Sequence, residues 1–134
     1  MLKKIWNQIK SNSLKSLKDN IEVGCNICSQ DFNKFYIDDI VYGNDSEVEI
    51  DDDNLFSIGT FHSHAVTNIL SWEFSYGDVS SGVNGKERYM YLSVDKDIYG
   101  VDMSKYTKSI RNCTNGKIDI YKLTEIINNG KVML

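Results

Sequence analysis

The sequence predicts an α/β fold in a single domain, and three observations lead to that prediction. The first twenty residues carry apolar side chains at helical spacing, whereas much of the remainder consists of short, β-rich apolar runs separated by turn residues. A chain of 134 residues lies within the usual size of one domain and can bury a core. Its 41% hydrophobic and 25% charged content is typical of soluble globular proteins. We therefore expect one domain over residues 1–134, with residues 1–20 forming a helix packed on it.

The first half of the chain is expected to contain one helix and four strands. The helix is indicated by apolar residues at helical spacing, first Leu2, Ile5, Trp6 and Ile9, and then Leu14 and Leu17. Asp19 and Asn20 then mark a break. Strands are expected at residues 22–28, 35–41, 47–50 and 55–61, with a turn at 43–46.

The second half is expected to begin its regular structure with a short helix from Ser75 to about Val83. Ser75 would be the N-cap and Asp78 the third helical residue, a pairing typical of a capping box. Asn84-Gly85 indicates a turn. Strands are expected at residues 88–94 and 98–101, and a last strand around residues 118–121 before a short C-terminal tail.

Charge and hydropathy limit the classes of partner. The net charge of −4 and the pI near 5.1 argue against a nonspecific nucleic-acid binder, so no nucleic-acid partner is expected. No apolar run approaches the ~20 residues that a membrane helix requires, and no signal-peptide core is recognisable. We therefore expect a cytoplasmic protein without a membrane partner. The oligomeric state is left open.

Cys25 and Cys28 form a C-x-x-C pair, which is found in redox sites and in halves of zinc sites. The second half of such a zinc site is absent from the sequence, and on a strand these two side chains leave by opposite faces. Three cysteines do not suggest a disulfide framework. We interpret the pair as small core residues.

His62 and His64 are the only histidines in the chain, and they stand two apart after a β-rich run. Side chains at i and i+2 of a strand leave by the same face. Downstream, Ser75 is followed three residues later by the carboxylate of Asp78. Two imidazoles and one carboxylate, with water in the fourth position, are a ligand set of catalytic zinc.

Glu22 is a further candidate, because it is a charged residue that opens an otherwise apolar strand. A buried, unpaired charge is costly and needs a reason. A zinc hydrolase also needs a carboxylate outside the coordination sphere to move protons.

Together these residues resemble the JAMM (MPN+, JAB-domain) metalloproteases, whose pattern is a glutamate on an early strand, then H-x-H, a spacer and S-x-x-D opening a helix. The matching residues, in the family's order, are Glu22, His62, His64, Ser75 and Asp78. The resemblance covers the chain from about residue 22 to the strand near residue 91. It implies a mixed, largely antiparallel sheet flanked by helices.

The chain departs from the family pattern in the spacer. Proline usually follows the second histidine, whereas this chain has Ala65 and no proline. The segment from residue 65 to 74 is longer than usual by roughly one helical turn. Glu73, in this segment, is a rival oxygen ligand to Asp78. The aromatic and apolar residues Leu70, Trp72 and Phe74 either receive substrate or anchor the segment on the core, and both interpretations are kept.

The resemblance implies zinc-dependent hydrolysis of a peptide or isopeptide bond, with a ubiquitin-like or other small protein as substrate. His62, His64 and Asp78 would hold Zn²⁺, which lowers the pKa of bound water toward about 7. Glu22 would be the general base and later the acid, and Ser75 would donate to the developing oxyanion. Two alternatives remain: a binding or scaffold module without activity, and a DNA-associated protein similar to the RadC type. The second is disfavoured because Ser63 and Ala65 stand where such proteins carry H-N-H-P.

Overall fold

In the computed structural model, residues 3–50, 54–65, 73–95, 97–114 and 119–134 are described. Their helices are α1 (Lys3–Asp19), α2 (Tyr76–Asn84), α3 (Thr107–Thr114) and α4 (Ile120–Gly130), with a 3₁₀ turn η1 (Met103–Tyr106). Their strands are β1 (Val23–Cys28), β2 (Tyr36–Ile37), β3 (Val41–Tyr42), β4 (Ser57–Ser63), β5 (Tyr89–Val94), β6 (Asp97–Asp102) and β7 (Val132–Met133). Among the described residues, no helix is both long and apolar enough to cross a membrane.

The described strands form one open sheet in the order β2-β1-β4-β5-β6-β7, with β3 also paired to β1. The β4–β5 pair is parallel, and the other pairs are antiparallel. α2 connects the two parallel strands, as a parallel pair requires a crossover. The predicted α/β class is confirmed, and the sheet is mixed and mostly antiparallel.

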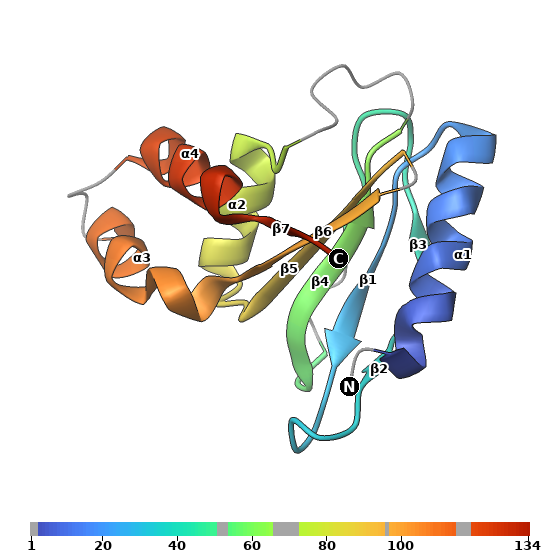
Figure 1. The fold of residues 1–134 in the computed structure, drawn as a ribbon, viewed down its shortest axis with the longest axis horizontal. Coiled ribbons are helices and arrows are strands. Elements are labelled where there is room, and N and C mark those ends of the chain that lie inside the picture. Colours follow the sequence, from blue (N-terminus) through green and yellow to red (C-terminus); the bar gives the residue numbers. More distant parts are fainter. Residues whose placement is uncertain (1–2, 51–53, 66–72, 96, 115–118) are drawn as a thin grey trace.

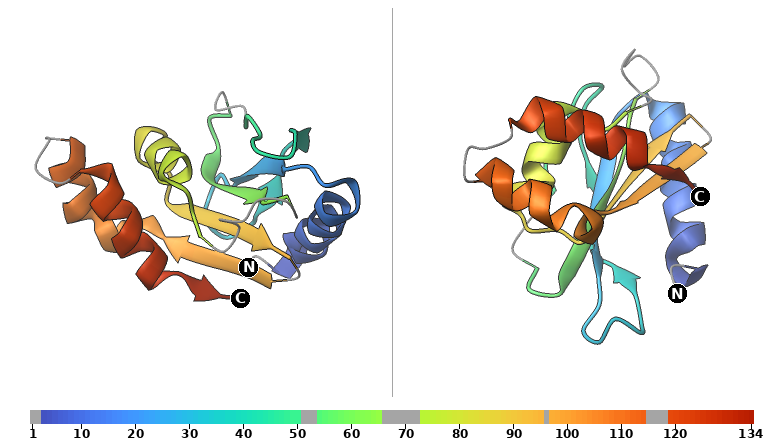
Figure 2. Two further views of the ribbon diagram at one scale, coloured as in Figure 1. Left: turned by 90° about the horizontal axis from the view of Figure 1, so that it is seen from above. Right: turned by 60° about the vertical axis from the view of Figure 1, so that its left-hand side comes forward.

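Helices cover both faces of this sheet (Figures 1 and 2). Strand β5 shows the alternation: Met90, Leu92 and Val94 belong to an apolar cluster with residues of α2 and α4, whereas Tyr91 belongs to a cluster with Ile5 and Ile9 of α1. A strand that is buried on both faces is expected to be nearly continuously apolar, and the sequences of β1 and β5 have this character. The centre of the sheet is therefore a rigid support between two cores.

Several predicted elements are confirmed. α1 ends at Asp19, and Asn20 adopts φ 52°, the left-handed conformation common just after a helix. The helix predicted after Ser75 is α2, and the strands predicted at 88–94 and 98–101 correspond to β5 and β6. The buried face of α1 differs in detail, because it continues from Ile9 through small serines while Leu14 is 60% exposed.

Three predictions of strands are wrong. Residues 35–41 do not form one strand: β2 and β3 are separated at Asp38, whose carboxylate accepts from the backbone and side-chain nitrogens of Asn26. Residues 47–50 are not a strand, because the carboxamide oxygen of Asn44 accepts from the backbone of Ser46 and Glu47 and closes a turn.

The third wrong prediction is the last strand, which is helix α4. Asp119 caps this helix, with its carboxylate accepting from the backbone of Lys122 at 2.8 Å. Ile120, Leu123 and Ile127 then follow at helical spacing and pack on the sheet. Residue 118 lies outside the described part of the chain. The expected short tail is instead α4 followed by β7, and η1 and α3 were not predicted.

Candidate metal centre

The candidate residues come from three elements whose ends meet on one face of the sheet (Figure 1). The β1–β4 register pairs Gly24 with His62, and its continuation by two residues on each strand places Glu22 opposite His64. The N-terminus of α2 carries Asp78 over the same place. The antiparallel register thus brings Glu22 close to two histidines that lie about forty residues later in the sequence.

Strand geometry explains why both histidines reach this point. His62 lies on β4 and His64 immediately after it, so their side chains leave by the same face, whereas Ser63 leaves by the opposite face. There the hydroxyl of Ser63 donates to Ser16 Oγ of α1 at 2.6 Å and accepts from the backbone nitrogen of Val23 at 3.0 Å. These bonds fix the end of β4 against β1 and α1.

The first turn of α2 fixes Asp78. The hydroxyl of Ser75 accepts from the backbone nitrogen of Asp78 at 3.0 Å, and the backbone nitrogen of Ser75 donates to Asp78 Oδ2 at 2.8 Å. This is the predicted capping box. The same oxygen also faces both imidazoles, so the cap sets the direction of the carboxylate toward the histidines.

Three electron-rich atoms converge at short distances. His62 Nε2 lies 3.2 Å from His64 Nε2, and Asp78 Oδ2 lies 3.2 Å from the former and 3.4 Å from the latter. Tetrahedral zinc with bonds of about 2.0–2.2 Å to nitrogen and oxygen holds its ligands about 3.3–3.6 Å apart. The observed triangle is close to the size that such an ion needs.

The protonation of the two imidazoles decides how hydrogen bonds fill this triangle. If both Nε2 atoms carry hydrogen, each can donate to Asp78, but the two donors then face each other at 3.2 Å. If only one carries hydrogen, the lone pair of the other faces the carboxylate. A cation at the centre would satisfy all three lone pairs together.

Glu22 completes the cluster and is 4% exposed. Its carboxylate and the ring nitrogens of His62 and His64 offer ligand atoms that lie within 4.8 Å of one another, and this buried group could hold a metal ion. The backbone of Glu22 is fixed on both sides, since its nitrogen donates to the carbonyl of Asn44 at 2.7 Å and its carbonyl accepts from Gly43 at 2.8 Å.

The electrostatics couple these groups. Burial raises the pKa of Glu22, and the nearby His62 and His64 only partly offset the rise. Burial alone would lower the pKa of His62, but the facing Asp78, together with Glu22 and Glu87, outweighs burial and raises the pKa above its usual value. Asp78 is also penalised by burial, yet the histidines and the backbone of Ser75 hold its pKa well below the usual range. The histidines thus favour the ionised form of Asp78.

Two residues near the site were missed by sequence reasoning. Glu87 accepts from the hydroxyl of Thr60 at 3.0 Å, and burial raises the pKa of Glu87 to about 7 despite that bond and the nearby His62. Thr60 stands two residues before His62 and shares its face, which is the only local signal. Asn128 of α4 forms hydrogen bonds with the backbone of Phe74. The residues next to Asn128 in the sequence gave no indication of this contact.

The remaining candidate residues are Glu73 and Phe74, which lie just before α2. Glu73 is exposed and, with residues of α4, lines a hollow of about 240 Å³, whereas Asp78 contacts both histidines. Phe74 is 1% exposed, and its ring centroid lies 6.4 Å from that of His62, as expected of an anchor on the core. Leu70 and Trp72 lie outside the described residues.

The C-x-x-C pair lies apart from any site of this kind. Cys25 and Cys28 are both fully buried in β1, which confirms the prediction that they are core residues. Burial, together with the nearby Asp38, raises the pKa of Cys25 to about 12 and that of Cys28 to about 11. Thiols of this kind are not the thiolates that redox chemistry and metal binding require.

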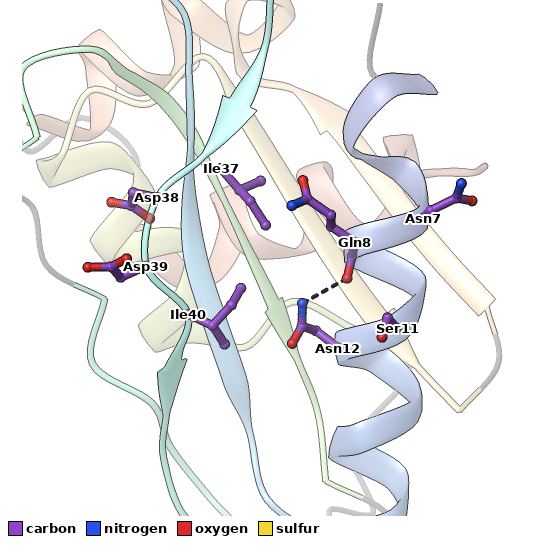
Figure 3. Close-up of a pocket in the computed structure, with 8 residues that line it drawn as sticks. All are labelled: Asn7, Gln8, Ser11, Asn12, Ile37, Asp38, Asp39 and Ile40. Atoms are coloured by element: carbon purple, nitrogen blue, oxygen red, sulfur yellow. Dashed lines mark hydrogen bonds between the residues drawn. The ribbon is translucent and has the colours of Figure 1, made fainter.

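A larger hollow of about 530 Å³ lies between α1 and the β2–β3 segment (Figure 3). Ile37 and Ile40 point into the space in front of α1, as do the side chains of Gln8 and Asn12, whereas Asp38 and Asp39 point away from the helix. Asn12 Nδ2 donates to the carbonyl of Gln8 at 2.7 Å. None of the residues that line this hollow belongs to the metal cluster.

Comparison of the chain with models of known protein families, with curated proteins and with solved structures gives no match. The site is therefore judged on its own geometry and chemistry.

Proposed function

We propose that this protein is a zinc-dependent hydrolase of the JAMM type, which cleaves a peptide or isopeptide bond in a protein substrate. The observation that carries the proposal is the triangle of His62 Nε2, His64 Nε2 and Asp78 Oδ2, with sides of 3.2–3.4 Å, beside the buried carboxylate of Glu22. The size of the triangle and its donor set of two imidazoles and one carboxylate fit a tetrahedral zinc ion with one open position. Such a position is what distinguishes a catalytic zinc from a structural one.

The roles of the residues follow from their positions. A bound zinc ion would supply an activated water and polarise the carbonyl of the substrate. Glu22 is buried and has a raised pKa, and its carboxylate lies within 4.8 Å of the ring nitrogens of His62 and His64. With Asp78 as the third ligand, Glu22 is suited to take a proton from the water and return it to the leaving amine. The hydroxyl of Ser75 accepts from the backbone of Asp78, and its own hydrogen can still be donated to a developing oxyanion.

The assignment to the JAMM type rests on the order of the five residues and on the elements that carry them. The glutamate immediately precedes β1, His62 lies on β4 with His64 just after its end, and the serine and aspartate open α2. The spacer after Ala65 is longer than the family's and contains no proline. Asp78 nevertheless contacts both imidazoles, which supports the choice of Asp78 over Glu73.

The metal is tested first, independently of activity. We expect the purified chain to bind close to one zinc ion per molecule under zinc-replete conditions, measured by elemental analysis after gel filtration. His62→Ala and His64→Ala should each lose it while remaining folded by circular dichroism. A folded parent protein that takes up no zinc would refute the proposal. Loss of zinc in Glu73→Ala, but not in Asp78→Ala, would move the third ligand to residue 73.

Activity is tested through Glu22. Glu22→Gln should retain zinc, and it should hydrolyse a cleavable peptide or ubiquitin-like fusion about 10²–10⁴-fold more slowly, the usual contribution of a positioned acid–base group. Loss of zinc in this variant would make Glu22 a ligand. If Glu22→Gln and the parent cleave equally fast, Glu22 is not the base. If both bind zinc and neither cleaves a broad panel of substrates, the protein is a non-catalytic binding module.

A further inference from the structure

We propose that Asn128 of α4 is a positioning residue for the metal centre, and that it acts through the peptide group between Phe74 and Ser75. The inference rests on the zinc site proposed above. It assigns a role to α4, which carries none of the five motif residues. Within the described part of the chain, the hydrogen bonds of Asn128 go to Phe74 and to neither histidine. Its influence on the site has to pass through the backbone that it binds.

The side chain of Asn128 makes a two-point contact with a residue 54 positions earlier. Its carboxamide oxygen accepts from the backbone nitrogen of Phe74 at 2.8 Å, and its Nδ2 donates to the carbonyl oxygen of Phe74 at 2.9 Å. Both polar ends of one amide side chain are thus used on one backbone residue. Two bonds of this kind fix rotation as well as position, because a single bond leaves the backbone free to turn about it.

The carbonyl of Phe74 and the nitrogen of Ser75 belong to the same planar peptide group. Asn128 Nδ2 donates to the carbonyl end of this group, and the N–H end donates to Asp78 Oδ2 at 2.8 Å. The plane of one peptide therefore connects the amide of α4 to the carboxylate that faces both histidines. A hydrogen bond accepted at the carbonyl also polarises the peptide and strengthens its N–H as a donor.

The packing around this contact makes it rigid. Phe74 is 1% exposed, and its ring lies in the apolar cluster that contains Val79 of α2 and Ile127 of α4. The same ring lies 6.4 Å, centroid to centroid, from that of His62. Asn128 thus holds the residue that packs beside one histidine and orients the group that holds the third ligand. Partners of metal ligands that lie outside the coordination sphere set the orientation of those ligands and the affinity of the site.

The test compares zinc affinity in Asn128→Ala and Asn128→Asp with the parent, using competition with a chromophoric chelator. Asn129→Ala is the matched control, because Asn129 is the exposed next residue on the same helix. Asp is nearly isosteric with Asn and can still accept from the Phe74 nitrogen, but its carboxylate cannot donate to the Phe74 carbonyl. The negative charge that Asn128→Asp adds would by itself strengthen the binding of zinc. Weaker zinc binding in this variant would therefore be due to the loss of the Nδ2 donor.

We expect both Asn128 variants to bind zinc about tenfold more weakly, at the lower end of the effect of outer partners of metal ligands, and Asn129→Ala to bind as the parent does. The visible absorption bands of the Co²⁺-substituted protein, which report the geometry of the site, should change in the Asn128 variants alone. Urea unfolding of the metal-free proteins separates this effect from a general loss of stability. If Asn128→Ala does not fold, Asn128→Asp decides.

Equal zinc affinity and an unchanged cobalt spectrum in the Asn128 variants would overturn the inference while leaving the proposed function intact. Equal weakening in Asn129→Ala would also overturn it, because the effect would then belong to α4 in general. A parent protein that binds no zinc would refute the proposed function, and this inference with it.

Discussion

Replacement of Glu87 by Gln should change how the stability of the metal-free protein depends on pH. Burial raises the pKa of Glu87 from 4.5 to about 7, so the folded protein binds a proton there that the unfolded chain releases. The protonated form favours the folded state: this stability is fully present below pH 4.5 and is lost as the pH rises through about 7. A shift of about 2.5 pKa units corresponds to about 3 kcal/mol as an upper limit.

The assay is urea unfolding of the parent and Glu87→Gln at a series of pH values from 5 to 8, with a chelator present throughout. The chelator matters because a cation near His62 would lower the pKa of Glu87. His62 also has a raised pKa, to which Glu87 contributes, and it gives a slope of the same sign. The difference between the two proteins therefore contains the contribution of Glu87 together with the change it causes at His62, and both act in the same direction. The free energy of unfolding of Glu87→Gln should fall less over this range. Parallel pH profiles in the two proteins would show that Glu87 does not titrate as argued.

Three further substitutions test the supports of the site, all by urea unfolding. A Cβ at Gly43 would collide with the carbonyl oxygen of Glu47, so Gly43→Ala should lower the free energy of unfolding by about 1–3 kcal/mol. A Cβ at Gly77 would meet its nearest atom at 3.7 Å, so Gly77→Ala should stabilise α2 by about 0.5–1 kcal/mol. Similar effects at the two glycines would contradict this. Ser63→Ala should lower the free energy of unfolding by about 1–3 kcal/mol, because it leaves the buried backbone nitrogen of Val23 without its acceptor. A decrease of less than about 0.5 kcal/mol would show that the Ser63 hydroxyl does not have this role.

The H-x-H and S-x-x-D pairs could be interpreted from sequence because each depends on short-range geometry. Alternation along a strand places His62 and His64 on one face whatever the rest of the fold does. A serine followed three residues later by aspartate favours a capping box because both partners lie in the first turn of the same helix. The structure has both features.

The wrong predictions of strands arose where one local signal in the sequence favoured a strand and another favoured a helix cap or a turn. Ile118 and Ile120 suggested a strand, but Asp119 between them is a helix cap, and the apolar spacing that follows is helical. The strand expected at 47–50 was displaced by the turn that Asn44 closes. Side chains of Asn and Asp bind nearby backbone nitrogens in this way and decide local structure against weak strand propensity.

What the sequence by itself determined, therefore, is which residues can act together within one strand or one helix turn. That Asp78 and Glu22 join the histidines was implied only through the family resemblance. The tertiary structure brings Asp78 to both imidazoles, Glu22 beside them and Asn128 to Phe74. These meetings depend on strand register and on the packing of α2 and α4 against the sheet. Both are set by burial of apolar area summed over the whole chain, which no short segment of sequence contains.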